Sequence, residues 1–184
     1  MSNFIVNPYR FEVGETDYEQ LLGTSNSVQK NAVEGGVGIG INASDSQLVG
    51  TKPTKFSVYA YGAGSPTGDT YAVICDYRDD PPLDNVRATS NIVDASTFGS
   101  GTGNIGWIEY TFDGTEALQQ YDTIAMIYTS GDGSNYIVTK MLSTSQPFET
   151  GKCFMNLWTE SIWQGTAHGG GHAMDMRFKL TVKG

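Results

Sequence analysis

Two histidines come closest in this sequence to a metal-binding pattern. His168 and His172 are four residues apart, and on a helix this spacing would direct both imidazoles at one metal ion. The three residues between them are glycines, which disfavour a helix. The sequence therefore predicts a flexible surface loop at residues 168–172, with a metal or glycan site as the alternative.

A second candidate lies in a polar loop that carries four aspartates: Asp76, Asp79, Asp80 and Asp84. Carboxylate oxygens are the ligands that Ca²⁺ prefers. The spacing does not follow the EF-hand loop, and Arg78 offsets part of the negative charge. We therefore predict a solvated acidic loop and no cofactor, with Ca²⁺ bound by these aspartates as the alternative.

Two tryptophans near the C-terminal end could bind a sugar. The face of an indole covers the apolar face of a pyranose, while amides and carboxylates bond its hydroxyl groups. Aromatic side chains are equally typical of a core or a subunit interface, which is the favoured reading of Trp158 and Trp163. The alternative is a glycan contact made by both tryptophans together with His168 and His172.

The sequence lacks a recognisable catalytic pattern. Its two histidines lie in one glycine-rich segment, and there is no GxSxG motif to present a nucleophilic serine. Paired carboxylates that cleave glycosides have no fixed spacing in a sequence, and nothing here points to them. The prediction is a protein that is not an enzyme.

An alternation of apolar and polar residues with a period of two predicts strands along most of the chain. In residues 52–77, two such runs flank a loop in which Pro66 and Gly68 suit a turn, which predicts a β-hairpin. One face of the first run carries Phe56, Val58 and Ala60, and the other carries Ser57, Tyr59 and Tyr61. Further strands are expected at residues 106–112, 122–129, 135–142, 153–158 and 174–182.

Many short strands and 23 glycines in 184 residues indicate an all-β protein. We expect an antiparallel β-sandwich of jelly-roll type, formed by residues 25–184 as a single domain. Residues 1–24 are assigned to an extended N-terminal arm and a short connecting segment. Within that segment, residues 16–19 match a capping box, which predicts one or two helical turns, with a plain loop as the alternative.

The arm is apolar at five positions: Phe4, Ile5, Val6, Tyr9 and Phe11. An apolar segment outside the main strand pattern either completes a sheet or docks on a neighbouring subunit. A sheet edge can accept such a segment by strand addition. These five residues are therefore the predicted docking site for a partner.

Charge and hydropathy exclude several classes of partner. A net charge of −9, with 11 lysines and arginines spread along the chain, argues against nucleic acid. No apolar run approaches the length of a membrane span, and the first residues do not form a secretory signal, so synthesis in the cytoplasm is expected.

Cys75 and Cys153 are interpreted as reduced residues packed as small apolar groups, with one disulfide between them as the alternative.

Several short sequence motifs are similar to those of a known family, although most of them consist of turn residues. They occupy residues 41–44, 50–55, 64–68, 88–91, 93–97, 110–112, 131–136 and 176–184. Together they resemble a module of tailed-phage and archaeal-virus structural proteins and of some bacterial surface proteins. The resemblance covers a little over half the chain, and the insertion near Arg78 and the segment with His168 depart from it. It implies a jelly-roll-like sandwich, similar to carbohydrate-binding modules, on a virion or cell surface.

These observations lead to a hypothesis about function. We expect a non-enzymatic virion structural protein, either a capsid decoration or a subunit of a tail or head fibre, that binds itself and other capsid or tail proteins. By analogy with the family, the first expectation for the homo-oligomer is a trimer. The alternative is a carbohydrate-binding or adhesin module at the cell surface or outside the cell.

Overall fold

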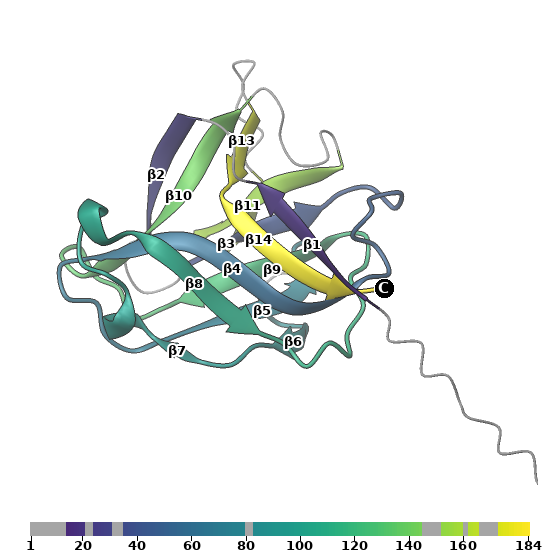
Figure 1. Ribbon diagram of the computed structural model, residues 1–184, viewed down its shortest axis with the longest axis horizontal. Helices are drawn as coiled ribbons and strands as arrows, with labels where there is room; N and C mark the ends of the chain where they lie inside the picture. The colour runs from purple at the N-terminus through teal and green to yellow at the C-terminus, as the bar shows by residue number, and fades with distance from the viewer. Residues whose placement is uncertain are drawn as a thin grey trace, which may run out of the picture.

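The computed structural model describes residues 14–20, 24–30, 35–79, 83–144, 152–159, 162–165 and 173–184. In these ranges the chain forms two antiparallel sheets, joined by loops and two short 3-10 turns (Figure 1). The prediction of an all-β protein built from two sheets is confirmed. None of the helical segments in these ranges has the length and apolar character needed to cross a membrane.

Each sheet has seven strands. The first, called sheet A, contains β1 (Glu15–Gln20), β2 (Thr24–Lys30), β4 (Lys52–Ala63), β8 (Gly106–Thr111), β10 (Tyr136–Thr144), β13 (Ala173–Met176) and β14 (Phe178–Lys183). The second, called sheet B, contains β3 (Gly35–Ile41), β5 (Asp69–Asp76), β6 (Val86–Thr89), β7 (Val93–Asp94), β9 (Asp122–Tyr128), β11 (Cys153–Thr159) and β12 (Ile162–Gly165). The 3-10 turns are η1 (Ala95–Thr97) and η2 (Thr102–Asn104).

From β2 onward, the strands of six or more residues alternate between the two sheets along the chain. β4 belongs to sheet A and β5 to sheet B, so the predicted hairpin at residues 52–77 is wrong, although both of its strands exist. Both strands have an apolar face, and these faces cover the same core from opposite sides, which a single hairpin in one sheet would not allow. The loop at residues 130–134 also crosses between sheets, from β9 to β10. This strand order does not establish the jelly-roll topology, which stays a prediction.

The core lies between the sheets and follows the predicted alternation. From sheet A it receives Phe56, Val58, Ala60, Phe178, Leu180 and Val182, and from sheet B it receives Val37, Ile39, Ile41, Ala72 and Ile74. Each large apolar side chain buried in this way contributes about 1.5–3 kcal/mol. The buried Tyr110 hydroxyl donates to Thr70 Oγ1 at 2.9 Å and so connects the two layers.

The segment predicted to form helical turns is a strand. Residues 15–20 form β1, which pairs with β14 from Glu15 opposite Lys183 to Gln20 opposite Phe178. A helix of one or two turns is marginal in isolation because nucleation is costly, whereas a strand beside β14 forms a ladder over its whole length. Part of the segment assigned to the arm and its connection therefore belongs to sheet A.

The sequence predicts one continuous strand at residues 174–182, but the structure has two strands there, β13 and β14, and sheet A divides between them. β14 runs along β4 from Lys52 to Val58, but further on β10 takes its place and pairs with β4 from Ala60 to Ala63. β13 then pairs with the remainder of β10. Arg177 is the residue between β13 and β14, at the point where the sheet divides.

Sheet B is buried on both faces in its centre. On the face away from the core, Val73, Cys75, Ala125 and Ile127 form a second apolar cluster and are at most 1% exposed. Gly38 lies opposite Ala125 in the neighbouring strand, and a Cβ at Gly38 would lie 2.1 Å from the carbonyl oxygen of Ile124. Glycine at this position therefore allows the close packing of β3 against β9.

Candidate functional site

Two aromatic side chains lie together on the outer face of sheet A. Tyr59 on β4 pairs with Trp107 on β8, and their ring centroids are 5.1 Å apart with the planes inclined at 53°. The alternation of each strand sends its neighbours into the core and these two rings outward. Both rings are half-buried, so each keeps surface that a partner can reach.

Two cations lie against these rings. The Arg177 guanidinium carbon is 4.1 Å from the centroid of Tyr59 and 5.5 Å from that of Trp107, and Lys179 Nζ is 4.9 Å from the centroid of Trp107. Cation–π contacts of this kind contribute about 0.5–1 kcal/mol at exposed sites. We call Tyr59, Trp107, Arg177 and Lys179 the aromatic–cation surface.

Arg177 is held by its backbone where sheet A divides. Its carbonyl accepts from the N–H of Tyr59 at 3.4 Å, and its N–H donates to the carbonyl of Lys140 at 3.2 Å. Its Nε is shielded from solvent and has no hydrogen-bond partner, which fits a guanidinium that lies over a ring. The place of this cation is therefore set by the fold and needs little reorganisation on binding.

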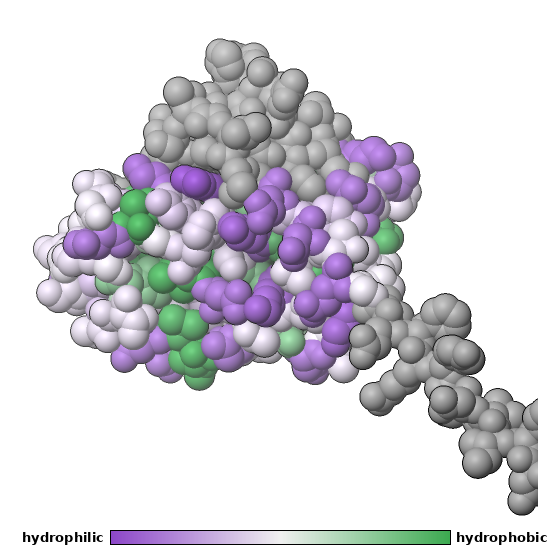
Figure 2. Space-filling model, in the orientation of Figure 1, coloured by the Kyte–Doolittle hydropathy of each residue, from purple (hydrophilic) through white to green (hydrophobic). Residues whose placement is uncertain are grey.

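Two acidic side chains, each paired with a lysine, lie near the aromatic–cation surface. Lys179 pairs with Glu19 of β1 at 3.3 Å, and Lys55 of β4 pairs with Glu109 of β8 at 3.3 Å. These pairs are exposed and contribute little to stability. Figure 2 shows a few separate hydrophobic patches on this face, with hydrophilic groups between them. The surface can stack against aromatic or apolar groups and accept acidic ones at its cations.

Among the described residues, the edge of sheet A next to this surface has no further strand. There β8 pairs with β4 alone, and the backbone groups of its even-numbered residues make the bonds, as the one from Phe112 N to Thr54 O at 2.8 Å indicates. The N–H and C=O groups of Trp107 and Glu109 therefore point away from the sheet, and no described residue bonds to them. Figure 1 shows β8 at the margin of its sheet.

A second aromatic group lies at one end of the sandwich. Tyr77 and Tyr121 are 6.1 Å apart in an edge-to-face arrangement, and the Arg78 guanidinium carbon lies 3.8 Å from the Tyr121 centroid. Tyr121 has a φ of 74°, which is uncommon for a residue other than glycine. The Tyr121 carbonyl accepts from Tyr77 N at 3.0 Å, and the Tyr121 N–H donates to Ile41 O at 2.7 Å, so β3 and β5 both hold this turn.

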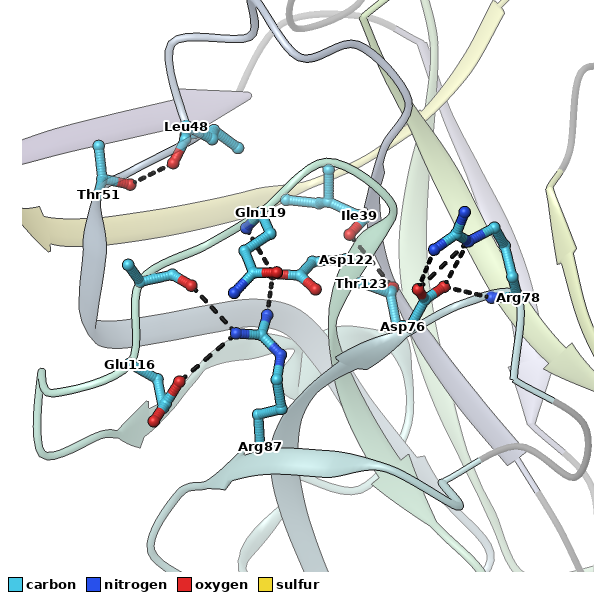
Figure 3. Close-up of polar contacts among 11 residues, drawn as sticks. Ile39, Leu48, Thr51, Asp76, Arg78, Arg87, Glu116, Gln119, Asp122 and Thr123 are labelled. Carbon is cyan, nitrogen blue, oxygen red and sulfur yellow. Dashed lines mark hydrogen bonds and ion pairs between the residues drawn. The ribbon is translucent and has the colours of Figure 1, made fainter.

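A buried ion pair holds the loop that leads from β8 to β9 (Figure 3). Arg87 of β6 pairs with Asp122 at the start of β9, and also donates to the carbonyl of Ala117 at 3.2 Å. Burial raises the pKa of Asp122, against the opposing effects of the Gln119 N–H and of Arg87. The Asp122 side chain is only 4% exposed, so its charge depends on Arg87. We interpret this pair as structural.

The structure describes three of the four aspartates of the predicted acidic loop: Asp76, Asp79 and Asp84. Asp76 binds the guanidinium of Arg78, which holds the pKa of the Asp76 carboxyl below its ordinary value (Figure 3). Asp80 lies outside the described residues. Where the structure does describe the chain, no three His, Cys, Asp or Glu side chains are close enough to hold a metal ion. The Ca²⁺ alternative for Asp76, Asp79, Asp80 and Asp84 stays a prediction.

The structure places some of the other predicted site residues. Trp158 on β11 and Trp163 on β12 are directly opposite each other in an antiparallel pair, so the fold brings these two positions together. His168 and His172 lie outside the described residues. The same is true of the predicted docking residues: Phe4, Ile5, Val6, Tyr9 and Phe11.

The two cysteines are on opposite faces of sheet B. Cys153 belongs to the core between the sheets, whereas Cys75 belongs to the outer apolar cluster. Both are free and buried, in agreement with the interpretation that they are reduced. Burial raises the pKa of the Cys75 thiol to about 12, so this side chain is not a nucleophile at neutral pH.

Sequence reasoning found the faces of the strands but missed the aromatic–cation surface. Tyr59 was placed on the polar face of its strand, yet nothing in the sequence indicates that Trp107 lies beside it. Arg177 is 118 residues from Tyr59 and 70 residues from Trp107 along the chain. The only signal was the presence of aromatic residues on a face that would otherwise be polar.

Comparison of the chain with family models, with curated proteins and with solved structures finds no match in any of the three.

Proposed function

We propose that this chain is a non-enzymatic structural protein of a virion surface, either a capsid decoration or a fibre subunit. It is made in the host cytoplasm and acts as a homo-oligomer through contacts with itself and with capsid or tail proteins. The sequence phrases that resemble phage and archaeal-virus structural proteins support the virion setting. The aromatic–cation surface supports the mode of action.

The observation that carries this proposal is the composition and position of that surface. Aromatic residues and arginine are enriched at protein–protein interfaces, where they supply most of the binding energy. Tyr59, Trp107 and Arg177 come together on the outer face of sheet A, held by β4, by β8 and by the junction between β13 and β14. A rigid face of this kind loses little conformational entropy when a partner binds.

The mass of the native assembly tests the proposal. We expect the full-length protein to be a homo-oligomer by native mass spectrometry and analytical ultracentrifugation. We expect the protein lacking residues 1–13 to be a folded monomer, because the predicted docking residues are gone. Circular dichroism and urea unfolding verify that the shortened chain is folded. A full-length protein that stays monomeric, or a shortened one that assembles normally, would contradict the proposal.

Quantification in purified particles tests the virion setting separately. A structural subunit is present in many copies per particle, in a fixed ratio to the major capsid protein. Absence from washed particles would contradict this part of the proposal even if the isolated protein assembles.

A carbohydrate-binding module is the second candidate, and one observation favours it. Trp158 and Trp163 are opposite each other on neighbouring strands, the placement that a two-ring sugar platform requires. A glycan array with the purified protein tests this function. Binding that is lost in Trp163→Ala and kept in Trp107→Ala would favour a glycan function at the β11–β12 pair over a role of the aromatic–cation surface.

A further inference from the structure

We propose that the open edge of β8 is the docking site for residues 9–13 of a second copy of this chain, which add to sheet A as an antiparallel strand. This inference deepens the proposed function and rests on its self-assembly.

The acceptor is defined by the backbone groups of Trp107 and Glu109. Their N–H and C=O groups point outward and form two donor–acceptor pairs that an added strand can use. At the next outward position the edge is already occupied, because Thr111 donates to Asn91 Oδ1 at 2.6 Å and accepts from Asn91 N at 3.0 Å. An added strand must therefore end before it reaches Thr111.

The sequence of residues 9–13 fits this edge in one antiparallel register. When Arg10 lies opposite Glu109, Glu12 lies opposite Trp107, whose ring is in contact with the cations of Arg177 and Lys179. On the outer face of the sheet, Arg10 then lies opposite a carboxylate that already pairs with Lys55, and Glu12 lies opposite a ring that two cations contact.

The same register matches the inner face and explains where the strand ends. Phe11 lies opposite Ile108, a half-buried residue at the rim of the core. Pro8 lies opposite Thr111, the position that Asn91 already occupies. Since proline has no N–H to donate, a ladder is expected to stop there.

The chain that supplies this strand cannot be the same molecule. Glu15 pairs with Lys183, and Lys183 pairs with Lys52, which is six residues along β4 from the partner of Ile108. Six residues along a strand and three steps between strands place Glu15 about 24 Å from Ile108. The four residue steps from Phe11 to Glu15 span at most about 14 Å. The arm that reaches β8 therefore comes from a second copy.

A disulfide between copies tests the register. Phe11 and Ile108 would form a non-hydrogen-bonded pair with Cα atoms about 4.5 Å apart, which a disulfide can bridge. Full-length Phe11→Cys and full-length Ile108→Cys are mixed and mildly oxidised. We expect a covalent heterodimer on a non-reducing gel, at least tenfold more abundant than with Phe4→Cys in place of Phe11→Cys. The native cysteines are buried, at 0% and 9% exposure, and do not compete.

Two further variants test the edge itself. Glu109→Pro removes the outward N–H and the charge, whereas Glu109→Gln removes only the charge. We expect Glu109→Pro to weaken self-association at least tenfold and Glu109→Gln to weaken it less than fivefold. Equal effects of the two variants would overturn strand addition.

The outcomes separate this inference from the proposed function. If wild-type protein is an oligomer but Phe11→Cys and Ile108→Cys do not cross-link, the inference is wrong and self-assembly stands. Cross-linking of Ile108→Cys with itself alone would show that β8 pairs with β8 of a second copy instead of with the arm. A cross-link formed within one molecule carrying both cysteines would overturn the role of the second copy. A monomeric wild type would contradict both proposals.

Discussion

Removal of the Arg87 side chain is expected to destabilise the protein strongly. Arg87 is the only cation paired with Asp122 among the described residues, and Asp122 is 4% exposed. In Arg87→Met the aliphatic part of the side chain is kept, but a carboxylate is left buried with only the N–H of Gln119, 2.6 Å away, bonded to it. Such a loss costs about 3–5 kcal/mol. For a domain of this size, 3 kcal/mol lowers Tm by about 6–12 °C.

The double variant Arg87→Met/Asp122→Asn isolates the charge interaction. Asparagine keeps an oxygen that accepts from the Gln119 N–H but carries no charge. We expect the double variant to recover about 2–4 kcal/mol relative to Arg87→Met, because the unpaired buried charge is gone. The exposed contact of Arg87 with Glu116, at 3.4 Å, contributes little.

The deficit of Arg87→Met is also expected to depend on pH. Burial already raises the pKa of Asp122, and loss of Arg87 removes two effects that lower it. The folded state then keeps this proton to higher pH than the unfolded chain, in which an aspartate titrates at about 3.9. The contribution of the group to stability is therefore full at low pH and is lost as pH rises through the folded-state pKa. The deficit of the variant should shrink between pH 7 and pH 5.

Urea unfolding at pH 7, 6 and 5, followed by circular dichroism and by tryptophan fluorescence, measures these free energies. The difference from wild type at each pH removes the contribution of other carboxylates, such as Asp76. A cost below about 1 kcal/mol for Arg87→Met would refute the structural role of the ion pair. A deficit that does not change with pH would refute the account of the buried charge.

Three more predictions concern packing and the surface. A Cβ at Gly38 would lie 2.5 Å from the Cα of Ala125, so Gly38→Ala should cost about 2–3 kcal/mol in urea unfolding, while Gly106→Ala, with open space around it, should change stability by less than about 1 kcal/mol. Equal costs would contradict the close packing of β3 on β9. Tyr110→Phe removes the donor to Thr70 and should cost about 1 kcal/mol in the same assay, and no change in the urea midpoint would refute that role. Trp107→Ala should weaken self-association about 30-fold in sedimentation equilibrium, as expected for an interface hot spot, and an unchanged constant would count against the aromatic–cation surface.

The strands and their faces could be predicted from the sequence because alternation is a local property. Phe56 and Val58 are buried where the pattern placed them, and Tyr59 is on the opposite face. The period of two fixes which side chains share a face whatever the neighbouring strand is. The prediction of helical turns at residues 16–19 is wrong because a capping box is a weak local signal. Pairing of these residues with β14 outweighs it.

The pairing of strands could not be predicted in the same way. Backbone hydrogen bonds between strands are nearly independent of side-chain identity, so two alternating runs joined by a turn look alike whether they pair or cross to another sheet. The predicted hairpin of β4 and β5 is wrong for this reason. The aromatic–cation surface follows from pairing too, since Trp107 lies opposite Tyr59 only through the register of β8 on β4.

The sequence by itself therefore determined that this protein is a β-protein with one apolar and one polar face on most strands. Only the tertiary structure decided that Arg177 lies at the division of sheet A, against the ring of Tyr59, and that no strand in the described ranges pairs with the outer edge of β8. The physical reason is that the alternation of side chains is a local property of the sequence, whereas the pairing of strands depends on the packing of the whole core.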